Sequence, residues 1–227
     1  MQAGKGKQTL SGQAGIEHAN VLVRNLESQD LPAVSAVHMA AFPDSALTML
    51  GAEAVHRYYE WQLTSQSEAT AIGGFAGGKV VGFCFGGIFR GAMSGFLRQN
   101  RMFLVWRLAS HPWLAGNPIV RERLKFGAHI LKRLMKPKAV VSLPKTSVAE
   151  PFGILSVATH PHSQGLGVGK LLMKEIENVA RQRDFREMFL TVHSDNHQAI
   201  TFYESLGWEK MPNNGAWEGG MKKYLQP

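Results

Sequence analysis

Cysteine and long apolar runs are both scarce in this chain of 227 residues. The one cysteine, Cys84, excludes a disulfide framework and a zinc site built from several cysteines, and its rarity fits a reducing, cytoplasmic setting. No stretch of about 18 apolar residues occurs, which argues against a membrane-spanning helix. Residues 1–20 also lack the apolar core of a secretory signal, and their glycine-rich, polar composition predicts a loose leader.

Acidic residues are almost missing from the middle of the chain. Between Ile88 and Glu150, twelve Lys and Arg residues are opposed only by Glu122 and Glu150, which gives this stretch a net charge of +10. The remainder holds 13 bases and 15 acids, a net charge of −2, so the excess of +8 belongs to one segment. No nucleic-acid reader motif accompanies the bases, and we therefore expect no nucleic-acid partner.

Apolar periodicity and turn residues predict strands and helices on both sides of the basic stretch. Ahead of it we expect a strand, two helical stretches and a hairpin that turns at Gly77 and Gly78, over residues 21–24, 30–41, 43–64, 71–75 and 80–85. After it we expect strand, helix, strand, helix and two final strands, over residues 154–159, 168–183, 188–193, 196–206, 208–211 and 217–225. Cys84 lies among apolar residues of a predicted strand, which favours a buried structural thiol over a nucleophile.

The basic stretch itself predicts helices. Residues 96–109 are apolar nearly all round a helical wheel, and between 119 and 136 the apolar residues fall on one side with most bases on the other. Three interpretations stay open. The stretch is a docked helical segment with a solvated basic face that covers an acceptor cleft, or it lies on an anionic membrane surface with Trp106 and Trp113 at the interface, or it attracts an anionic acceptor.

A glycine-rich turn lies between a predicted strand and a predicted helix, at Gln164-Gly165-Leu166-Gly167-Val168-Gly169-Lys170. Glycines let the backbone approach a ligand, and the free N–H groups and dipole at a helix start favour an anion such as a phosphate. A tight turn without a ligand is the simpler interpretation. The spacing is G-x-G-x-G, unlike the G-x-G-x-x-G of dinucleotide folds, and Leu171 follows where a nucleotide-triphosphatase loop needs Ser or Thr.

Two motifs carry a resemblance to a known family. The pattern Q-x-x-G-x-G at Gln164, Gly167 and Gly169 resembles the acetyl-CoA-binding motif of the GNAT acetyltransferase superfamily. The segment 196–208, NHQAITFYESLGW, resembles the N-x-x-A-x-x-F-Y-x-x-x-G-F/W segment of that superfamily. The resemblance covers about 21–87 and 152–225, which makes the basic stretch 88–150 an insertion between the third and fourth strands.

The resemblance implies an α/β fold with a mixed, mostly antiparallel central sheet, splayed fourth and fifth strands and helices on both faces, in a single domain over 21–227. It also implies acetyl-CoA as co-substrate. Backbone N–H groups of the turn would hold its pyrophosphate, from Gln164, Gly165, Leu166, Gly167, Val168, Gly169 and Lys170. Backbone groups of Val157, Ala158 and Thr159 would bond the pantetheine arm, and Asn196 would contact the cofactor from the next helix start.

The implied chemistry is direct attack of a neutral amine on the thioester. Tyr203 matches the tyrosine that commonly serves as general acid, because a phenol stays protonated near neutrality and can donate to sulfur. Packing between helix and sheet is the alternative role for this side chain. His193 is the candidate base, with His160 or deprotonation through water as alternatives, since Ser156 and Thr191 are not competent bases alone.

The acceptor is expected to be a small or lipid-linked primary amine, anionic if the basic stretch attracts it, such as an amino sugar or a nucleotide-linked amine. A longer acyl donor, carried by CoA or an acyl carrier protein, and a non-catalytic CoA-binding module are the alternatives. The spacings His193-x-x-x-His197 and His160-x-His162 invite a metal site, but no further ligand is pinned near them except Asp195, and we expect no metal. The oligomeric state is not indicated by the sequence.

Overall fold

A computed structural model of the chain describes residues 21–64, 69–88, 92–118, 120–121, 151–213 and 216–226. One sheet of seven strands forms its centre, in the order β1-β2-β3-β4-β5-β7-β6. The strands are β1 (Leu22–Asn25), β2 (Thr70–Ala76), β3 (Lys79–Gly87), β4 (Phe152–Thr159), β5 (Glu187–Thr191), β6 (Glu209–Asn213) and β7 (Ala216–Tyr224). Neighbours pair antiparallel except β4 and β5, which are parallel.

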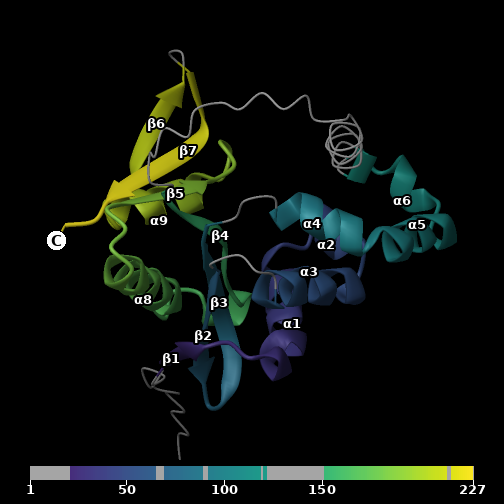
Figure 1. Cartoon of the computed structure of the whole chain (residues 1–227), viewed down its shortest axis with the longest axis horizontal. Coiled ribbons are helices and arrows are strands. Elements are labelled where there is room, and N and C mark those ends of the chain that lie inside the picture. Colours follow the sequence, from purple (N-terminus) through teal and green to yellow (C-terminus); the bar gives the residue numbers. More distant parts are fainter. Residues whose placement is uncertain are drawn as a thin grey trace, which may run out of the picture.

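Helices cover both faces of this sheet (Figure 1). The α-helices are α1 (Leu31–Ala41), α2 (Ala46–Met49), α3 (Ala52–Thr64), α4 (Ala92–Gln99), α5 (Arg101–Ser110), α6 (Trp113–Gly116), α8 (Val168–Gln182) and α9 (His197–Ser205). Two short 3-10 turns, η1 (Ser28–Asp30) and η2 (Pro161–Ser163), precede α1 and the glycine-rich turn. The expected mixed α/β fold with helices on both faces is therefore confirmed.

Each face has its own buried core. On one face α8 and α9 pack on the sheet through residues such as Leu172, Ile176 and Tyr203, and on the other face α1, α3 and α4 pack through residues such as Val34 and Tyr59. Removing apolar area from water at roughly 25 cal/mol per Å² makes these two cores the main stabilising contribution. The sheet between them fixes the relative position of every strand end that borders the site.

Close approach of α8 to the sheet depends on a glycine. A Cβ added at Gly82 on β3 would lie 2.9 Å from Cγ1 of Val168 and 3.0 Å from the backbone oxygen of Ala158. Both distances are shorter than ordinary van der Waals contact, so a larger residue would push the first turn of α8 away from β4. The absence of a side chain at Gly82 therefore sets where the glycine-rich turn lies.

The fourth and fifth strands diverge, as expected from the resemblance. They pair only at Phe152 with Met188 and at Gly153 with Phe189, whereas β4 continues beside β3 as far as Thr159. A register shift between Phe85 and Gly86 leaves Leu155 as the extra residue of β4. The central strand β4 is only half-buried from 153 to 157, and beyond Gly153 its edge toward β5 has no strand partner. The space beside this unpaired edge is the candidate cleft.

Several predicted boundaries change. The stretch expected over 43–64 is two helices, α2 and α3, because the chain turns at Gly51, whose φ is +94°. The strand expected over 188–193 ends at Thr191, so His193 lies on the following loop. Asp30 does precede α1, but its carboxylate accepts hydrogen bonds from Arg24 and from the Glu27 amide instead of capping the helix.

Between β3 and β4, the described residues form three helices, α4, α5 and α6. Phe96 on α4 packs edge-on against Tyr58, and the Arg107 guanidinium on α5 donates to the Leu50 carbonyl at 2.8 Å, so this segment docks on α2 and α3. The amphipathic helix expected over 119–136 lies, apart from residues 120 and 121, outside the described residues, as do residues 1–20. Over the described ranges, no helix has the length and apolarity needed to cross a membrane.

Candidate functional site

The glycine-rich turn ends in an uncapped helix start. Gly165 and Gly167 have φ of +80° and +78°, a left-handed conformation that favours glycine, and a Cβ at either position would meet nothing within 4 Å. The first amide bonded inside α8 is that of Leu171, to the Gly167 carbonyl at 3.0 Å. The amides of the three preceding residues come before this first helical bond, at the positive end of a helix of 15 residues. This geometry suits a phosphate.

Three segments converge beside this turn. A Cβ built on Gly169 would lie 3.6 Å from Oγ1 of Thr159 at the end of β4 and 3.3 Å from Cζ of Phe202 on α9. The end of β4, the glycine-rich turn and helix α9 are thus neighbours although they are far apart in the sequence. Val157, Ala158 and Thr159 belong to the part of β4 that has no β5 partner, so their strand edge faces the cleft.

The remaining turn residues differ in exposure. Gln164, Leu166 and Lys170 are exposed, whereas Val168 is buried in the core below α8. Val168 therefore anchors the turn through its side chain, and only its backbone can serve a ligand. The long side chain of Lys170 is free of the core and carries a positive charge at the helix start.

Asn196 begins α9. Its Oδ1 accepts a hydrogen bond from the Ala199 amide at 3.0 Å, which is the usual N-cap contact. Because capping uses the Oδ1 oxygen, a cofactor would contact Asn196 through Nδ2. The helix cap and the predicted ligand contact are compatible in one side chain.

Tyr203 lies on α9 with its ring in the core and 9% of the residue exposed. The ring packs near Phe202 and Trp208, with centroids 5.3 and 6.1 Å away, and its carbonyl accepts from the Leu206 and Trp208 amides. Burial raises the pKa of the Tyr203 phenol, and the neighbouring thiol of Cys84 adds to the effect. Tyr203 therefore stays protonated at neutral pH, as a proton donor must.

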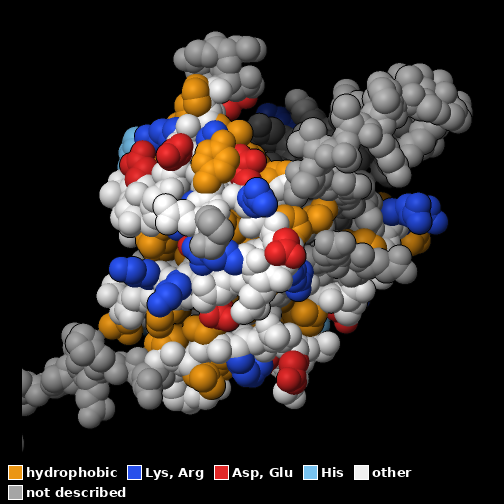
Figure 2. Space-filling view, turned by 60° about the vertical axis from the view of Figure 1, so that its left-hand side comes forward, with side chains coloured by type: hydrophobic (Ala, Val, Ile, Leu, Met, Phe, Trp, Pro, Cys, Tyr) orange, Lys and Arg blue, Asp and Glu red, His pale blue; other side chains and the backbone are white. Residues whose placement is uncertain are grey.

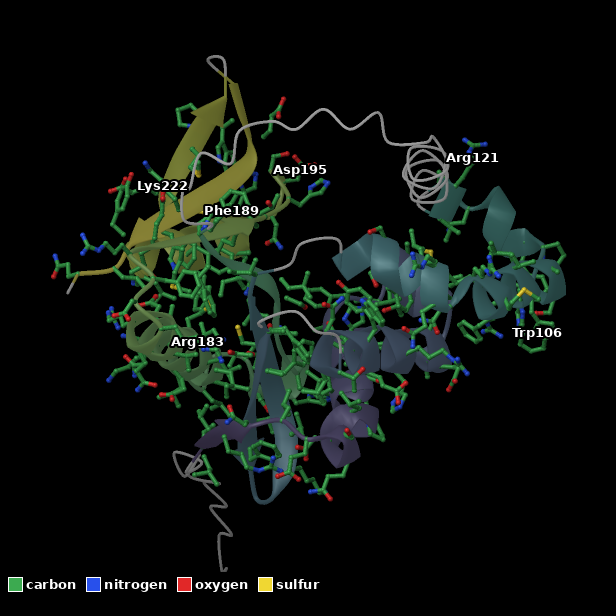
Figure 3. All side chains as sticks on the ribbon, viewed as in Figure 1. Trp106, Arg121, Arg183, Phe189, Asp195 and Lys222 are labelled. Atoms are coloured by element: carbon green, nitrogen blue, oxygen red, sulfur yellow. The ribbon has the colours of Figure 1, made fainter. Side chains whose placement is uncertain are left out.

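The histidines lie at the edge of this arrangement. His193 is exposed on the loop after β5, and its Nδ1 lies 3.7 Å from a carboxylate oxygen of Asp195, a residue that Figure 3 shows on the same loop. His160 accepts a hydrogen bond from the His162 amide at 3.3 Å, which fixes the turn that follows β4. Within the described ranges, no three His, Cys, Asp or Glu side chains are grouped to hold a metal ion.

Sequence reasoning missed two residues on the opposite face of β4. Nδ1 of His38 on α1 lies 2.8 Å from the hydroxyl of Tyr59 on α3, and that hydroxyl lies 3.0 Å from Oγ of Ser156. Ser156 and the extra residue Leu155 both face α1 and α3, because the register shift reverses the alternation of the strand. The 97 residues between Tyr59 and Ser156 leave no local pattern that could have indicated the contact.

The comparisons with known proteins agree with this geometry. The model of the acetyltransferase (GNAT) family matches residues 32–208. A search of curated proteins gave no match. Among solved structures, the PaiA N-acetyltransferase from Thermoplasma acidophilum in complex with coenzyme A superposes with a TM-score of 0.54 at 14% identity, over 90% of this chain and 99% of that one.

Two further structures have different acceptors in their names. The ribosomal-protein-alanine N-acetyltransferase from Brucella melitensis gives a TM-score of 0.54 at 18% identity, over 90% of this chain and 99% of its own. An aminoglycoside 6'-acetyltransferase type Ii gives 0.53 at 12% identity, over 91% and 98%. At such identities the likeness is one of fold, and it leaves the acceptor open.

Proposed function

This chain belongs to the GNAT family of acetyltransferases, and we propose that it moves the acetyl group of acetyl-CoA to a primary amine by direct attack. The observation that carries the proposal is the convergence of Thr159, Gly169 and Phe202. It supports the proposal because the unpaired edge of β4, a helix start suited to phosphate and the helix that carries Tyr203 are neighbours. The cofactor is CoA in its acetylated form, and the reaction needs no metal.

The pyrophosphate would accept hydrogen bonds from backbone amides between Gln164 and Lys170, with the positive end of α8 favouring its charge. The pantetheine arm would pair with the backbone of Val157, Ala158 and Thr159, where β4 has no β5 partner. Asn196 would donate from Nδ2. These roles are supported by exposed turn residues and by the free edge of β4.

In the reaction, the lone pair of the amine attacks the thioester carbonyl, the new C–N bond forms and the C–S bond breaks. The departing thiolate takes a proton from the Tyr203 phenol. The attacking nitrogen loses its extra proton to His193 or to water, which returns a proton to Tyr203 through solvent. His193 is supported as base by its exposed place after β5 and by the nearby Asp195 carboxylate.

The test uses a pair of matched glycines. Gly167 and Gly78 both have positive φ, +78° and +76°, and both face open space, so alanine imposes the same backbone strain at either position. Calorimetric titration with acetyl-CoA should give roughly tenfold weaker binding, or none, for Gly167→Ala, because the turn shifts and the methyl group enters the phosphate position. Gly78→Ala, at the tip of the β2–β3 hairpin, should bind as the parent does. Equal binding by the two variants would refute the cofactor site.

The acceptor is proposed to be anionic, from the twelve bases between 88 and 150. The same single domain, 21–227, would then carry 88–150 as an insertion that attracts substrate. The test compares an amino sugar with its phosphate ester as acceptors. Because salt screens the attraction between charges, added salt should lower kcat/KM for the phosphate ester and leave kcat/KM for the amino sugar without phosphate unchanged. Comparing the turnover rate with acetyl-CoA to the rates with longer acyl-CoA and acyl carrier protein thioesters identifies the acyl donor.

A membrane role for the same segment has its own support. On α5 and α6, four large apolar side chains are more than 60% exposed: Met102, Val105, Trp106 and Trp113. Trp106 points away from the body at the outer side of α5 (Figure 3). Arg98 and Arg101 are exposed beside them, and no Asp or Glu occurs between 92 and 121. Apolar and aromatic residues with bases and without acids suit the interface of an anionic bilayer.

The face formed by α8 and the C-terminal strands differs, because positive and negative side chains lie side by side there (Figure 2). Flotation with vesicles of phosphatidylglycerol and phosphatidylcholine should therefore capture the protein through α5. Trp106→Ser and Trp113→Ser should reduce capture, whereas Tyr224→Ser, an exposed aromatic on β7, should not. Equal capture by all variants, or no capture, removes the membrane proposal.

A further inference from the structure

A chain of hydrogen bonds leads from α2 to the cleft through the interior of the protein. Oγ of Ser45 lies 3.3 Å from Nε2 of His38, Nδ1 of His38 lies 2.8 Å from the Tyr59 hydroxyl, and that hydroxyl lies 3.0 Å from Oγ of Ser156. Tyr59 is fully buried and His38 is 7% exposed, while Ser156 is half-buried on the open part of β4. Ser45, at the start of α2, is half-buried as well, so Ser156 is distinguished by its place on the part of β4 that has no β5 partner.

The protons in this chain point one way. The Ser45 hydroxyl donates its single proton to Oγ1 of Thr48 at 3.0 Å, so toward His38 it can only accept. His38 then carries its proton on Nε2, which leaves Nδ1 as the acceptor of the Tyr59 proton. Tyr59 in turn accepts from Ser156. The last hydroxyl, that of Ser156, has its proton directed inward and its lone pairs left for the cleft.

His38 holds this polarity because it stays neutral. Burial lowers the pKa of His38 to about 4. The groups that pack on its ring, Phe42 and Tyr59, bring no charge, and neither does Ser45. A proton passed inward from the cleft would have to rest on an imidazolium in this core, which is unfavourable near neutral pH. The chain therefore orients the Ser156 hydroxyl and does not carry the proton of the reaction away.

We propose that Ser156 binds the acceptor amine, with its Oγ accepting an N–H of the attacking nitrogen, and that Tyr59 and His38 are positioning residues that fix Ser156 as an acceptor. The inference rests on the proposed acetyl transfer and adds a contact on the acceptor side. Ser156 lies one residue before Val157, whose backbone would bond the pantetheine arm, and on the opposite face of the strand from the core that holds Tyr203. An amine bound at Ser156 would therefore approach the thioester from the side of α1 and α3, and Tyr203 would approach it from the side of α9.

This arrangement also selects what is bound. A fixed acceptor favours a group that brings an N–H, and the same position would repel the lone pair of a ligand that has no proton to offer. One N–H of a primary amine can bond to Ser156 while the nitrogen lone pair faces the thioester. This series of hydrogen bonds thereby orients the attacking nitrogen, and the orientation is lost if any one of the hydrogen bonds is removed.

The experiment compares variants that remove one hydroxyl each. In steady-state turnover, Ser156→Ala and Tyr59→Phe should raise KM for the amine roughly tenfold, the effect of one missing oriented hydrogen bond, with KM for acetyl-CoA unchanged. Ser156→Thr keeps the hydroxyl on a strand and should restore most of the parent KM. Tyr58→Phe is the matched control, because it removes the neighbouring buried hydroxyl from the same helix, keeps the ring contact with Tyr59 and takes away none of these hydrogen bonds. Unchanged amine KM in Ser156→Ala would overturn the proposal.

A second measurement does not depend on turnover. Nitrogen chemical shifts of the His38 ring should show a neutral imidazole protonated on Nε2, and Tyr59→Phe should shift Nδ1. A proton on Nδ1 would reverse the chain and overturn the proposal. Calorimetric titration of the same variants with CoA separates the two levels of inference. If the parent binds CoA and Ser156→Ala leaves KM for the amine unchanged, only the proposed acceptor contact is contradicted. If the parent does not bind CoA, the proposed transferase function is contradicted.

Discussion

The hydroxyl groups of Tyr59 and Ser156 lie 3.0 Å apart and join helix α3 to the central strand β4, although 97 residues separate them in the sequence. The contact exists because a register shift in β4 turns Ser156 toward α1 and α3. It places a polar group next to the part of β4 that has lost its β5 partner. In the proposed assignment, Ser156 of the second half of the chain would contact the acceptor, and helices from the first half would hold it in place through Tyr59.

Stability should fall in acid because of His38. Its ordinary pKa of 6.5 applies in the unfolded chain, and burial lowers it to about 4 in the fold. Between these values the unfolded state binds the proton and the folded state does not, so this contribution is complete above pH 6.5 and is lost as pH falls toward 4. Urea unfolding at pH 7.5, 6 and 5 (about 25 °C) should show a loss on the order of 2 kcal/mol that is absent in His38→Gln. A parallel pH dependence in both proteins would contradict the assignment.

Tyr203→Phe should lower kcat by roughly 100-fold, because the departing thiolate loses its proton donor. The ring still packs against Trp208, so CoA affinity and the thermal midpoint should stay near those of the parent. Stopped assays of thiol release, with calorimetric titration as the binding control, check both halves. Full turnover with an unchanged pH profile would assign Tyr203 to packing alone.

Lys223→Met should destabilise the fold by about 2–4 kcal/mol. Lys223 on β7 donates to both oxygens of Glu177 on α8 at 2.8 Å and to the Leu206 carbonyl at the end of α9 at 2.6 Å, and Glu177 is buried. Removing the amine leaves a buried carboxylate without that partner and releases the helix that carries Tyr203. Denaturant unfolding measures the loss.

The matched control for Lys223 is Arg57→Met, which breaks a partly exposed ion pair with Glu53 on α3 and keeps an apolar side chain against the Phe103 ring. Exposed pairs of this kind contribute under about 1 kcal/mol, so this variant should unfold close to the parent. If both variants lose the same free energy of unfolding, the buried position of Glu177 has no special role.

Gly82→Ala should weaken acetyl-CoA binding from a distance. The new methyl would lie 2.9 Å from Val168 Cγ1, and relief of this contact moves the first turn of α8. We expect a cost of about 1–3 kcal/mol in unfolding free energy and a several-fold weaker Kd. Gly116→Ala, whose Cβ would meet nothing within 4 Å, should change neither quantity. Parent-like Kd in Gly82→Ala would show that the turn position is set elsewhere.

Much of this fold could be predicted from sequence because its signals are local. Alternation of apolar residues and paired glycines predict β2 and β3. The motif around Gln164 predicts the glycine-rich turn, and α8 begins after it at Val168, as expected. Two boundaries moved for physical reasons. Gly51 interrupts a helical stretch by its left-handed φ, and β5 ends at Thr191, after which the Val192 amide still bonds to Gly219 while the chain turns away.

The acceptor side could not be predicted in this way. His38 and Tyr59 sit among apolar residues of α1 and α3 that pattern analysis assigns to a core, and they are indeed buried there. What makes them functional candidates is a hydrogen bond to a strand on the far side of the sequence, and that contact depends on a bulge without a sequence signature. The sequence predicts only that Ser156 is not a competent base alone, and the proposed role as an oriented acceptor depends on its contact with Tyr59.

The most direct test of the central claim is amine-dependent release of CoA. Parent protein, acetyl-CoA and a panel of primary amines (amino sugars, their phosphates, polyamines, aminoglycosides and N-terminal peptides) are incubated, free thiol is measured, and the amine is analysed by mass spectrometry. We expect thiol release that depends on at least one amine, matched by equal N-acetylated product, and lowered in Tyr203→Phe. Tight binding of acetyl-CoA without amine-dependent release across the panel would contradict the account and identify the chain as a CoA-binding module.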